Sequence, residues 1–134
     1  MNYLIDTQIF IWYQLNSEKL NKGIYALLKD MSNTVYISVI SLFEIAIKQK
    51  IGKLPEFDMS IISLRELIIQ DGFTMLDLKT EHVSAYADIP LLTEHRDPFD
   101  RLLLATALYE NIPIISADQN FARYQPLMQL VLNR

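Results

Sequence analysis

The sequence contains no cysteine and only 3 glycines and 5 prolines among its 134 residues. Without cysteine there is no disulfide framework, no thiolate zinc site and no cysteine nucleophile. The low glycine and proline counts, together with 51% hydrophobic residues, argue against disorder. No apolar run approaches the roughly 20 residues that a membrane span needs, because Glu44, Lys48 and Arg65 interrupt the longest ones. We therefore expect no membrane association.

Positive charge is also scarce, with 12 Lys and Arg against 16 Asp and Glu and a net charge of −4. This excludes a simple basic nucleic-acid coat protein, but not an enzyme that meets nucleic acid through a metal ion. The N-terminal residues lack the basic start and long apolar centre of a signal peptide, which is compatible with a cytoplasmic location. The length, without repeats or linkers, predicts a single domain over residues 1–134.

The pattern that is present alternates short apolar strands with amphipathic helices. Strands are predicted at residues 3–5, 34–37, 73–76, 114–115 and 130–132, and helices at 7–14, 18–31, 41–51, 61–70, 80–89 and 98–109. The spacing of Ser41 and Glu44 is that of a capping box, and Pro98 suits a first helical position. The alternation predicts an α/β domain with a mainly parallel sheet of four or five strands and helices on both faces. In such a sheet the site lies beyond the carboxyl ends of the strands.

Four acidic residues fall at such positions: Asp6, Glu44, Asp100 and Asp118. Any one of them, taken alone, is better explained as a helix cap or as a complement to a helix dipole. Four together would repel strongly, by roughly 3 kcal/mol for each close pair at an effective dielectric constant of about 20. A cluster of this kind must bind cations or hold protons, and oxygen ligands without cysteine favour Mg²⁺ or Mn²⁺.

Four motifs resemble those of PIN-domain nucleases of the VapC toxin type. They are Leu4-Ile5-Asp6-Thr7-Gln8 with Trp12, the stretch 41–48 with Gly52-Lys53-Leu54, the stretch 95–107, and Ile115-Ser116-Ala117-Asp118 with Phe121 and Tyr124. The resemblance runs from Leu4 to about Tyr124. It implies a three-layer PIN-like fold and a Mg²⁺- or Mn²⁺-dependent endoribonuclease, the toxin of a bacterial toxin–antitoxin pair. A small antitoxin that blocks the acidic site and a homodimeric assembly are further implications.

The same resemblance assigns roles to individual residues. Asp6 and Asp100 are the preferred metal ligands, and Glu44 binds metal or positions the attacking water. Asp118 supports the ligands without contacting the metal itself. Thr7 and Ser116 match the hydroxyl positions of the family and would orient a carboxylate or a water, although ordinary capping is an equal alternative.

Two choices near residue 98 stay open. Asp97 lies three residues before Asp100 and can reach the same cavity, but its position before Pro98 also suits a helix cap. Arg96 and Arg101 either grip phosphate or form surface ion pairs.

Three lysines after Glu44, at positions 48, 50 and 53, form either a local positive patch or a solvated helix face. His82 and His95 lack metal-ligand spacing, which disfavours a histidine-based mechanism. Two other functions are considered. A HAD-like phosphotransferase with Asp6 as nucleophile is weakened because Gln8 stands where a second aspartate is needed. A non-catalytic PIN-type binding module is disfavoured because all four acids are present.

Overall fold

The computed structural model describes residues 1–92, 97–125 and 127–134. Its centre is a sheet of five parallel strands in the order β3-β2-β1-β4-β5. The strands are β1 (Asn2–Ile5), β2 (Thr34–Ser38), β3 (Thr74–Leu76), β4 (Ile114–Ser116) and β5 (Leu130–Leu132). All five predicted strands are therefore present, and the prediction of a parallel α/β sheet is confirmed.

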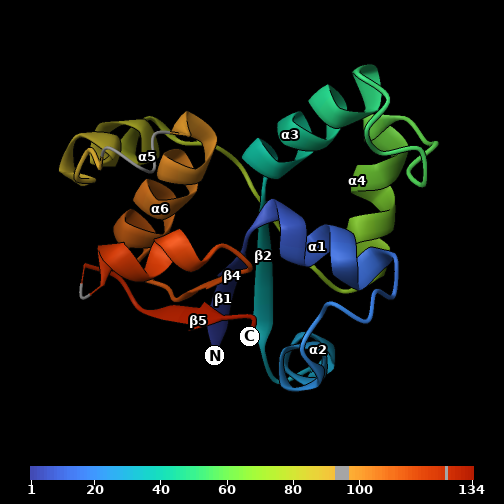
Figure 1. The fold of residues 1–134 in the computed structure, drawn as a ribbon, viewed down its shortest axis with the longest axis horizontal. Coiled ribbons are helices and arrows are strands. Elements are labelled where there is room, and N and C mark those ends of the chain that lie inside the picture. Colours follow the sequence, from blue (N-terminus) through green and yellow to red (C-terminus); the bar gives the residue numbers. More distant parts are fainter. Residues whose placement is uncertain (93–96, 126) are drawn as a thin grey trace.

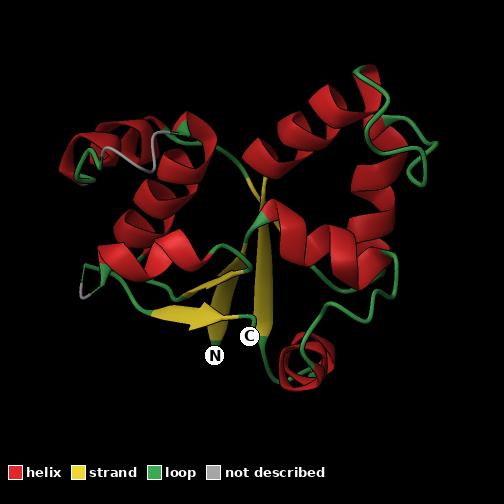
Figure 2. Ribbon diagram, viewed as in Figure 1, coloured by secondary structure: helices red, strands yellow, loops and turns green. Residues whose placement is uncertain are grey.

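Helices cover both faces of this sheet (Figures 1 and 2). One face carries α1 (Thr7–Gln14), α2 (Lys22–Lys29), α3 (Val39–Lys50) and α4 (Ile61–Gln70). The other carries α5 (Thr80–Ala85), the 3-10 helix η1 (Tyr86–Asp88), α6 (Pro98–Glu110) and the 3-10 helix η2 (Gln119–Tyr124). In the described part of the chain no helix is long and apolar enough to cross a membrane.

The apolar residues of each strand alternate between two hydrophobic cores. In β1, Tyr3 and Ile5 pack into the core under α1 to α4, whereas Leu4 packs into the core under α6. Ile114 and Ile115 of β4 divide in the same way. Successive side chains of a strand point to opposite faces, so continuous apolar strands supply both cores of a three-layer domain.

Several helix boundaries differ from the predictions. α3 begins at Val39 rather than Ser41, because the Ser38 hydroxyl caps it by accepting from the Ile40 N–H at 3.0 Å. The capping-box prediction at Ser41 is therefore wrong. Glu44 lies in the second turn of α3 instead of the first.

The helix predicted over 18–31 is shorter at both ends. It begins at Lys22 because the Asn21 side chain caps it through the Gly23 and Ile24 N–H groups. The helix predicted over 80–89 ends at Ala85 and continues as the 3-10 helix η1.

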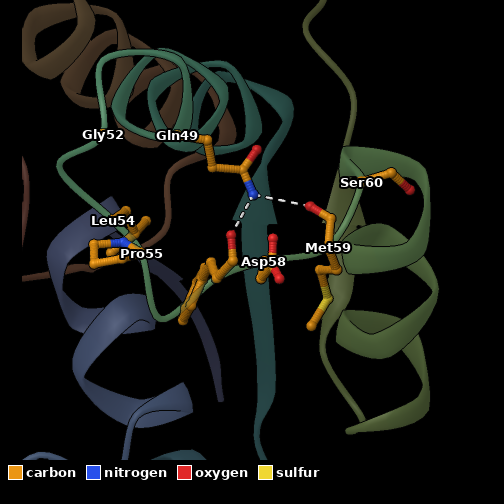
Figure 3. Close-up of a pocket in the computed structure, with 8 residues that line it drawn as sticks. Gln49, Gly52, Leu54, Pro55, Asp58, Met59 and Ser60 are labelled. Atoms are coloured by element: carbon orange, nitrogen blue, oxygen red, sulfur yellow. Dashed lines mark hydrogen bonds between the residues drawn. The ribbon is translucent and has the colours of Figure 1, made fainter.

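The loop between α3 and α4 is held by one amide side chain. Gln49 Nε2 donates hydrogen bonds to the carbonyl oxygens of Phe57 and Met59, each at 2.9 Å (Figure 3). Leu54 and Phe57 of this loop are buried in the core. Gly52 begins the loop with a φ of 75°, a backbone conformation that glycine adopts without strain. These hydrogen bonds and buried side chains hold the loop against α3.

Candidate carboxylate site

The site lies where the order of strands reverses. From β1 the chain moves outward through β2 to β3, whereas β4 and β5 lie on the other side of β1. The connections after neighbouring β1 and β4 therefore leave in opposite directions, which opens a crevice at their carboxyl ends. Asp6 directly follows β1, and Ser116 ends β4.

Asp6 is held on both carboxylate oxygens. Its Oδ1 accepts the Ile9 N–H at 2.8 Å, which caps α1. Its Oδ2 accepts the Ser116 hydroxyl at 2.6 Å and the Ala117 N–H at 3.0 Å. These three bonds occupy three of about four acceptor positions on a carboxylate, so Asp6 is fixed in orientation while one position remains on Oδ1.

Ser116 connects two of the acids. While its hydroxyl donates to Asp6, its oxygen accepts the Asp118 N–H at 2.9 Å. The Asp118 carboxylate in turn accepts the Asn120 N–H at 2.9 Å and caps η2. Both the capping role and the orienting role considered for Ser116 therefore have a geometric basis, and one hydroxyl sets the positions of Asp6 and Asp118 together.

Glu44 is positioned across the crevice by Thr7. The Thr7 hydroxyl lies 2.7 Å from Glu44 Oε1 and 2.9 Å from Ser41 Oγ. Because a hydroxyl has a single proton, donation to Glu44 leaves the Thr7 oxygen to accept from Ser41. Ser41 is fully buried and was predicted only as a cap. It lies one turn before Glu44 on α3 and contacts Thr7, which is 34 residues away in the chain, so no local sequence signal indicated this role.

Asp97 and Asp100 separate into two roles at the start of α6. Asp97 Oδ1 accepts the Phe99 N–H at 2.8 Å and the Asp100 N–H at 3.3 Å, so Asp97 is the helix cap. Asp100, in the first turn, lines the cavity together with Asp6. The geometry favours Asp100 as the third acid of the site.

One cavity of about 390 Å³ brings all four predicted acids together. Its lining consists of Asp6, Thr7, Gln8, Trp12, Glu44, Lys48, Asp100, Ala117 and Asp118. Gln8 was not predicted to belong to the site, and Lys48 was weighed only as part of a surface patch. Gln8 and Trp12 are four residues apart on α1, and Glu44 and Lys48 are four apart on α3, so each pair shares one helix face. The four-residue spacing from Glu44 could therefore have predicted that Lys48 lies beside the site, and the same spacing links Gln8 to Trp12.

Burial, with a smaller contribution from charge repulsion, shifts Asp6 and Glu44 toward their protonated forms. Desolvation raises the pKa of Asp6 to about 6, although the hydrogen bonds from Ser116, Ile9 and Ala117 oppose the shift and the Asp100 charge adds to it. Desolvation also raises the pKa of Glu44 to about 7, with the Thr7 hydrogen bond opposing it and the charges of Asp100 and Asp97 adding to it. Desolvation is therefore the main cause of both shifts, and repulsion from the Asp100 charge is a smaller one.

These shifts predict that the contribution of Asp6 to the stability of the metal-free protein falls as pH rises. A carboxyl whose pKa is raised on folding stabilises the fold below its ordinary value and loses that contribution as pH rises through the folded pKa. For Asp6 the window runs from its ordinary value of 3.8 to about 6, and the loss is about 3 kcal/mol. Chemical denaturation in EDTA across this range, compared between the parent and Asp6→Asn, isolates the contribution. A constant difference between the two proteins would contradict it.

Arg101 does not belong to the site. Its side chain is 2% exposed and donates to the carbonyl oxygens of Ile89 and Pro90 and to the Tyr86 hydroxyl. Its guanidinium carbon also lies 4.9 Å from the centre of the Tyr86 ring. Both predicted roles, phosphate binding and a surface ion pair, are therefore wrong. The buried arginine instead links α6 to the end of η1 through hydrogen bonds. Arg96 and His95 lie outside the described residues.

Replacing Arg101 with methionine is expected to lower the free energy of unfolding by about 2–4 kcal/mol, because the buried carbonyls of Ile89 and Pro90 lose their donor. The matched control is Arg65→Met on α4, which removes a half-exposed arginine and should cost less than about 0.5 kcal/mol. Urea denaturation of both variants measures the difference. Equal stability of the two would contradict the buried role.

The donor set of the cavity fits a hard cation by its chemistry. Its acidic ligands are carboxylates only, and His82 lies elsewhere, fully buried with Nε2 2.6 Å from Glu110 Oε2. Among the described residues, no three acidic or histidine side chains stand close enough to enclose one ion. Mg²⁺ characteristically keeps several waters and takes only one or two carboxylates together with substrate phosphate. The cavity offers the one or two carboxylates that such an ion needs, because Asp6 and Asp100 both line it.

Fold and cavity together define an open-sheet α/β protein with a carboxylate site at its topological switch point. A model of the PIN domain family matches residues 3–126, which is nearly the whole chain. The chain belongs to the PIN domain family, as its motifs indicated.

Several solved structures share this fold. One is a chain of VapBC2 from Rickettsia felis, in a complex with a DNA fragment from the VapBC2 promoter. This chain superposes on it with a TM-score of 0.70 at 20% identity, over 98% of both chains. VapBC-5 from Mycobacterium tuberculosis, of the VapBC family of toxin–antitoxin systems, gives 0.62 at 17% identity over 99% of this chain and 98% of that one. FitAcB from Neisseria gonorrhoeae gives 0.64 at 19% identity over 96% of both. No curated protein matches the sequence.

Proposed function

We propose that this protein is a Mg²⁺- or Mn²⁺-dependent endoribonuclease and the toxin of a toxin–antitoxin pair. The observation that carries the proposal is the single cavity into which a PIN-domain chain brings Asp6, Glu44, Asp100 and Asp118. The similarity to VapBC structures, which are toxin–antitoxin complexes, supports the biological role. A small antitoxin that covers the cavity, a homodimer and a cytoplasmic location belong to the same proposal.

Asp6 and Asp100 would hold the ion, and Asp118 would support Asp6 through the shared contact with Ser116. When bound, Mg²⁺ or Mn²⁺ supplies a more acidic water and neutralises charge on the transferring phosphate. Asp6 would hold the ion without reorganising, since Ser116 and two backbone N–H groups already fix the orientation of its carboxylate.

Glu44 is the residue best suited to handle a proton. Thr7 occupies its Oε1, and in the described part of the chain no hydrogen bond reaches Oε2. A pKa near 7 allows this carboxyl to accept a proton at neutral pH, which is what activation of an attacking water requires. Thr7 thus orients Glu44 so that one oxygen stays available.

The two alternative functions have less support. For a phosphotransferase, Asp6 would have to attack phosphorus, yet it is 5% exposed and both its oxygens accept hydrogen bonds. A purely binding module does not explain why four carboxylates share one cavity at an electrostatic cost. Trapping of a phosphoenzyme would revive the first alternative.

The test is RNA cleavage by the purified protein. Structured RNA should be cut in Mg²⁺ or Mn²⁺, cutting should stop in EDTA, and added metal should restore it. The order of addition separates metal loss from slow denaturation. Undiminished cleavage in EDTA would contradict the metal mechanism, and no cleavage of any RNA in either metal would contradict the nuclease assignment.

A further inference from the structure

Trp12, the single tryptophan of the chain, lines three adjoining cavities. The first is the carboxylate cavity. The second, of about 310 Å³, shares Gln8, Trp12 and Lys48 with it and continues to Lys53 and Lys19. The third, of about 560 Å³, lies between Trp12 and Tyr25. The second cavity shares three lining residues with the first and shares Trp12 and Ser17 with the third, so the three cavities neighbour one another around Trp12. We call the second and third cavities the path away from the acids.

The Trp12 indole is available to a ligand. One part of it packs against the core formed with α2 and α4, and the residue as a whole is half-buried. Among the described residues no aromatic ring or cation stacks on it. Tyr25, across the third cavity, is already engaged by the Tyr13 ring at 5.5 Å and by Lys29 Nζ at 5.4 Å from its ring centre. Trp12 is therefore the open aromatic face on this path.

The charge along the path is opposite to that of the molecule. The second and third cavities are lined by Lys19, Lys22, Lys48 and Lys53 against Glu18 and Glu56, and Lys48 also lines the carboxylate cavity. Four lysines and two glutamates give a local charge of +2, whereas the whole chain carries −4. This part of the surface therefore attracts a polyanion.

The loop between α3 and α4, which carries Lys53, is held in place by hydrogen bonds in the absence of a ligand. Lys53 belongs to the loop that Gln49 ties down through the carbonyls of Phe57 and Met59 (Figure 3). Its backbone N–H also bonds to the Lys48 carbonyl at 2.9 Å, which holds the two lysines at neighbouring places. Lys50, on the same helix, lines none of the three cavities.

We propose that this path binds the single-stranded RNA next to the cleaved bond, with one base stacked on Trp12 and backbone phosphates beside Lys48 and Lys53. The inference rests on the proposed nuclease function and extends it to the residues that hold the strand beside the cleaved bond. A tryptophan face flanked by lysines is the combination that single-stranded nucleic acid requires. Duplex RNA does not fit, since its bases are already stacked inside the helix.

Trp12 itself reports on the proposal, because no other tryptophan contributes to the emission. The unmodified protein is titrated at low salt, in EDTA so that the strand stays intact, with a single-stranded RNA of about ten nucleotides. Stacking should quench the tryptophan fluorescence in a saturable way. A perfectly paired duplex of equal length is the control and should quench far less at equal phosphate concentration. Equal quenching by both, or none by the single strand, overturns the proposal; the latter is the outcome expected if the path receives a peptide instead.

Three variants add an independent readout. Trp12→Leu keeps apolar packing and removes the aromatic face, so binding of the single strand, measured by fluorescence anisotropy of a labelled strand, should weaken about tenfold. Lys53→Ala should flatten the plot of log affinity against log salt by about 0.7. Its matched control, Lys50→Ala, should leave that slope unchanged. Unaltered binding in both Trp12→Leu and Lys53→Ala overturns the proposal.

Cleavage kinetics distinguish this inference from the nuclease assignment. If the parent cuts RNA and Lys53→Ala raises KM with kcat unchanged, both hold. If the parent cuts RNA while neither fluorescence nor KM responds, the path is wrong and the nuclease stands. If single strands quench Trp12 but no RNA is ever cut, the nuclease assignment fails and the path remains as a binding surface.

Discussion

Replacing Asp100 with asparagine is expected to reduce Mg²⁺-dependent RNA cleavage by about a hundredfold or more, because removal of a ligand should cost at least as much as removal of a group that only supports one. Asp100 lines the cavity and raises the pKa of both Asp6 and Glu44 through its charge. The same substitution should shrink the rise in melting temperature that Mg²⁺ gives the parent. An ion at about 100 times its Kd stabilises the folded state by about 2.7 kcal/mol.

Asp97→Asn is the matched control, three residues away on the same helix terminus. Its carboxylate caps α6, and asparagine caps a helix about as well as aspartate does. We expect stability within about 0.5 kcal/mol of the parent and most of the cleavage retained. Loss of cleavage and of the Mg²⁺ response in Asp97→Asn, with both kept in Asp100→Asn, would transfer the ligand role to Asp97.

Asp6→Asn is expected to abolish toxicity in cells. Expression of the parent alone should arrest bacterial growth, and the variant at equal protein level should allow growth. The amide cannot replace the carboxylate on Oδ2, where Ser116 and the Ala117 N–H both lie within hydrogen-bond distance. In either orientation the NH₂ group would face a backbone N–H, that of Ala117 or that of Ile9, and the negative charge at the site would be lost. Growth curves with quantified expression measure the effect.

A Thr34→Ser variant, at the start of β2 and away from the cavity, controls for general effects of substitution and should remain toxic. Equal toxicity of Asp6→Asn and the parent would show that growth arrest does not come from the carboxylate site. Absence of arrest by the parent would instead contradict the toxin role while leaving the nuclease chemistry open to the assay with purified protein.

The sheet, and the meeting of the four acids in one cavity, were predictable because strand ends and helix starts leave local signals in the sequence. The apolar run that ends at Asp6 predicts the end of a strand and the start of a helix. Asp97 followed by Pro98 likewise predicts a helix cap and the first residue of a helix. What could not be predicted depends on contacts between distant segments. Arg101 shows this most clearly, since only the tertiary arrangement places the Ile89 and Pro90 carbonyls around its guanidinium. Ser41 is a second case, because its partner Thr7 lies 34 residues away in the chain.

The choice between helix starts follows the same logic. Both Ser38 and Ser41 are acceptable caps by residue type, and the strand register decides between them. β2 continues through Ser38, which pairs with Leu76 of β3, so the helix begins immediately afterwards. That earlier start turns Ser41 and Glu44 toward α1 and makes Glu44 part of the cavity.

The most direct measurement is Mn²⁺ binding by the purified protein, followed by electron paramagnetic resonance, in the parent and in the double variant Asp6→Asn/Asp100→Asn. The free-ion signal should fall as the parent takes up Mn²⁺, and Mg²⁺ should restore it by competition. The double variant, shown to be folded by circular dichroism, should leave the free-ion signal almost unchanged. Equal uptake of Mn²⁺ by the folded double variant and the parent would contradict a metal site built from these carboxylates.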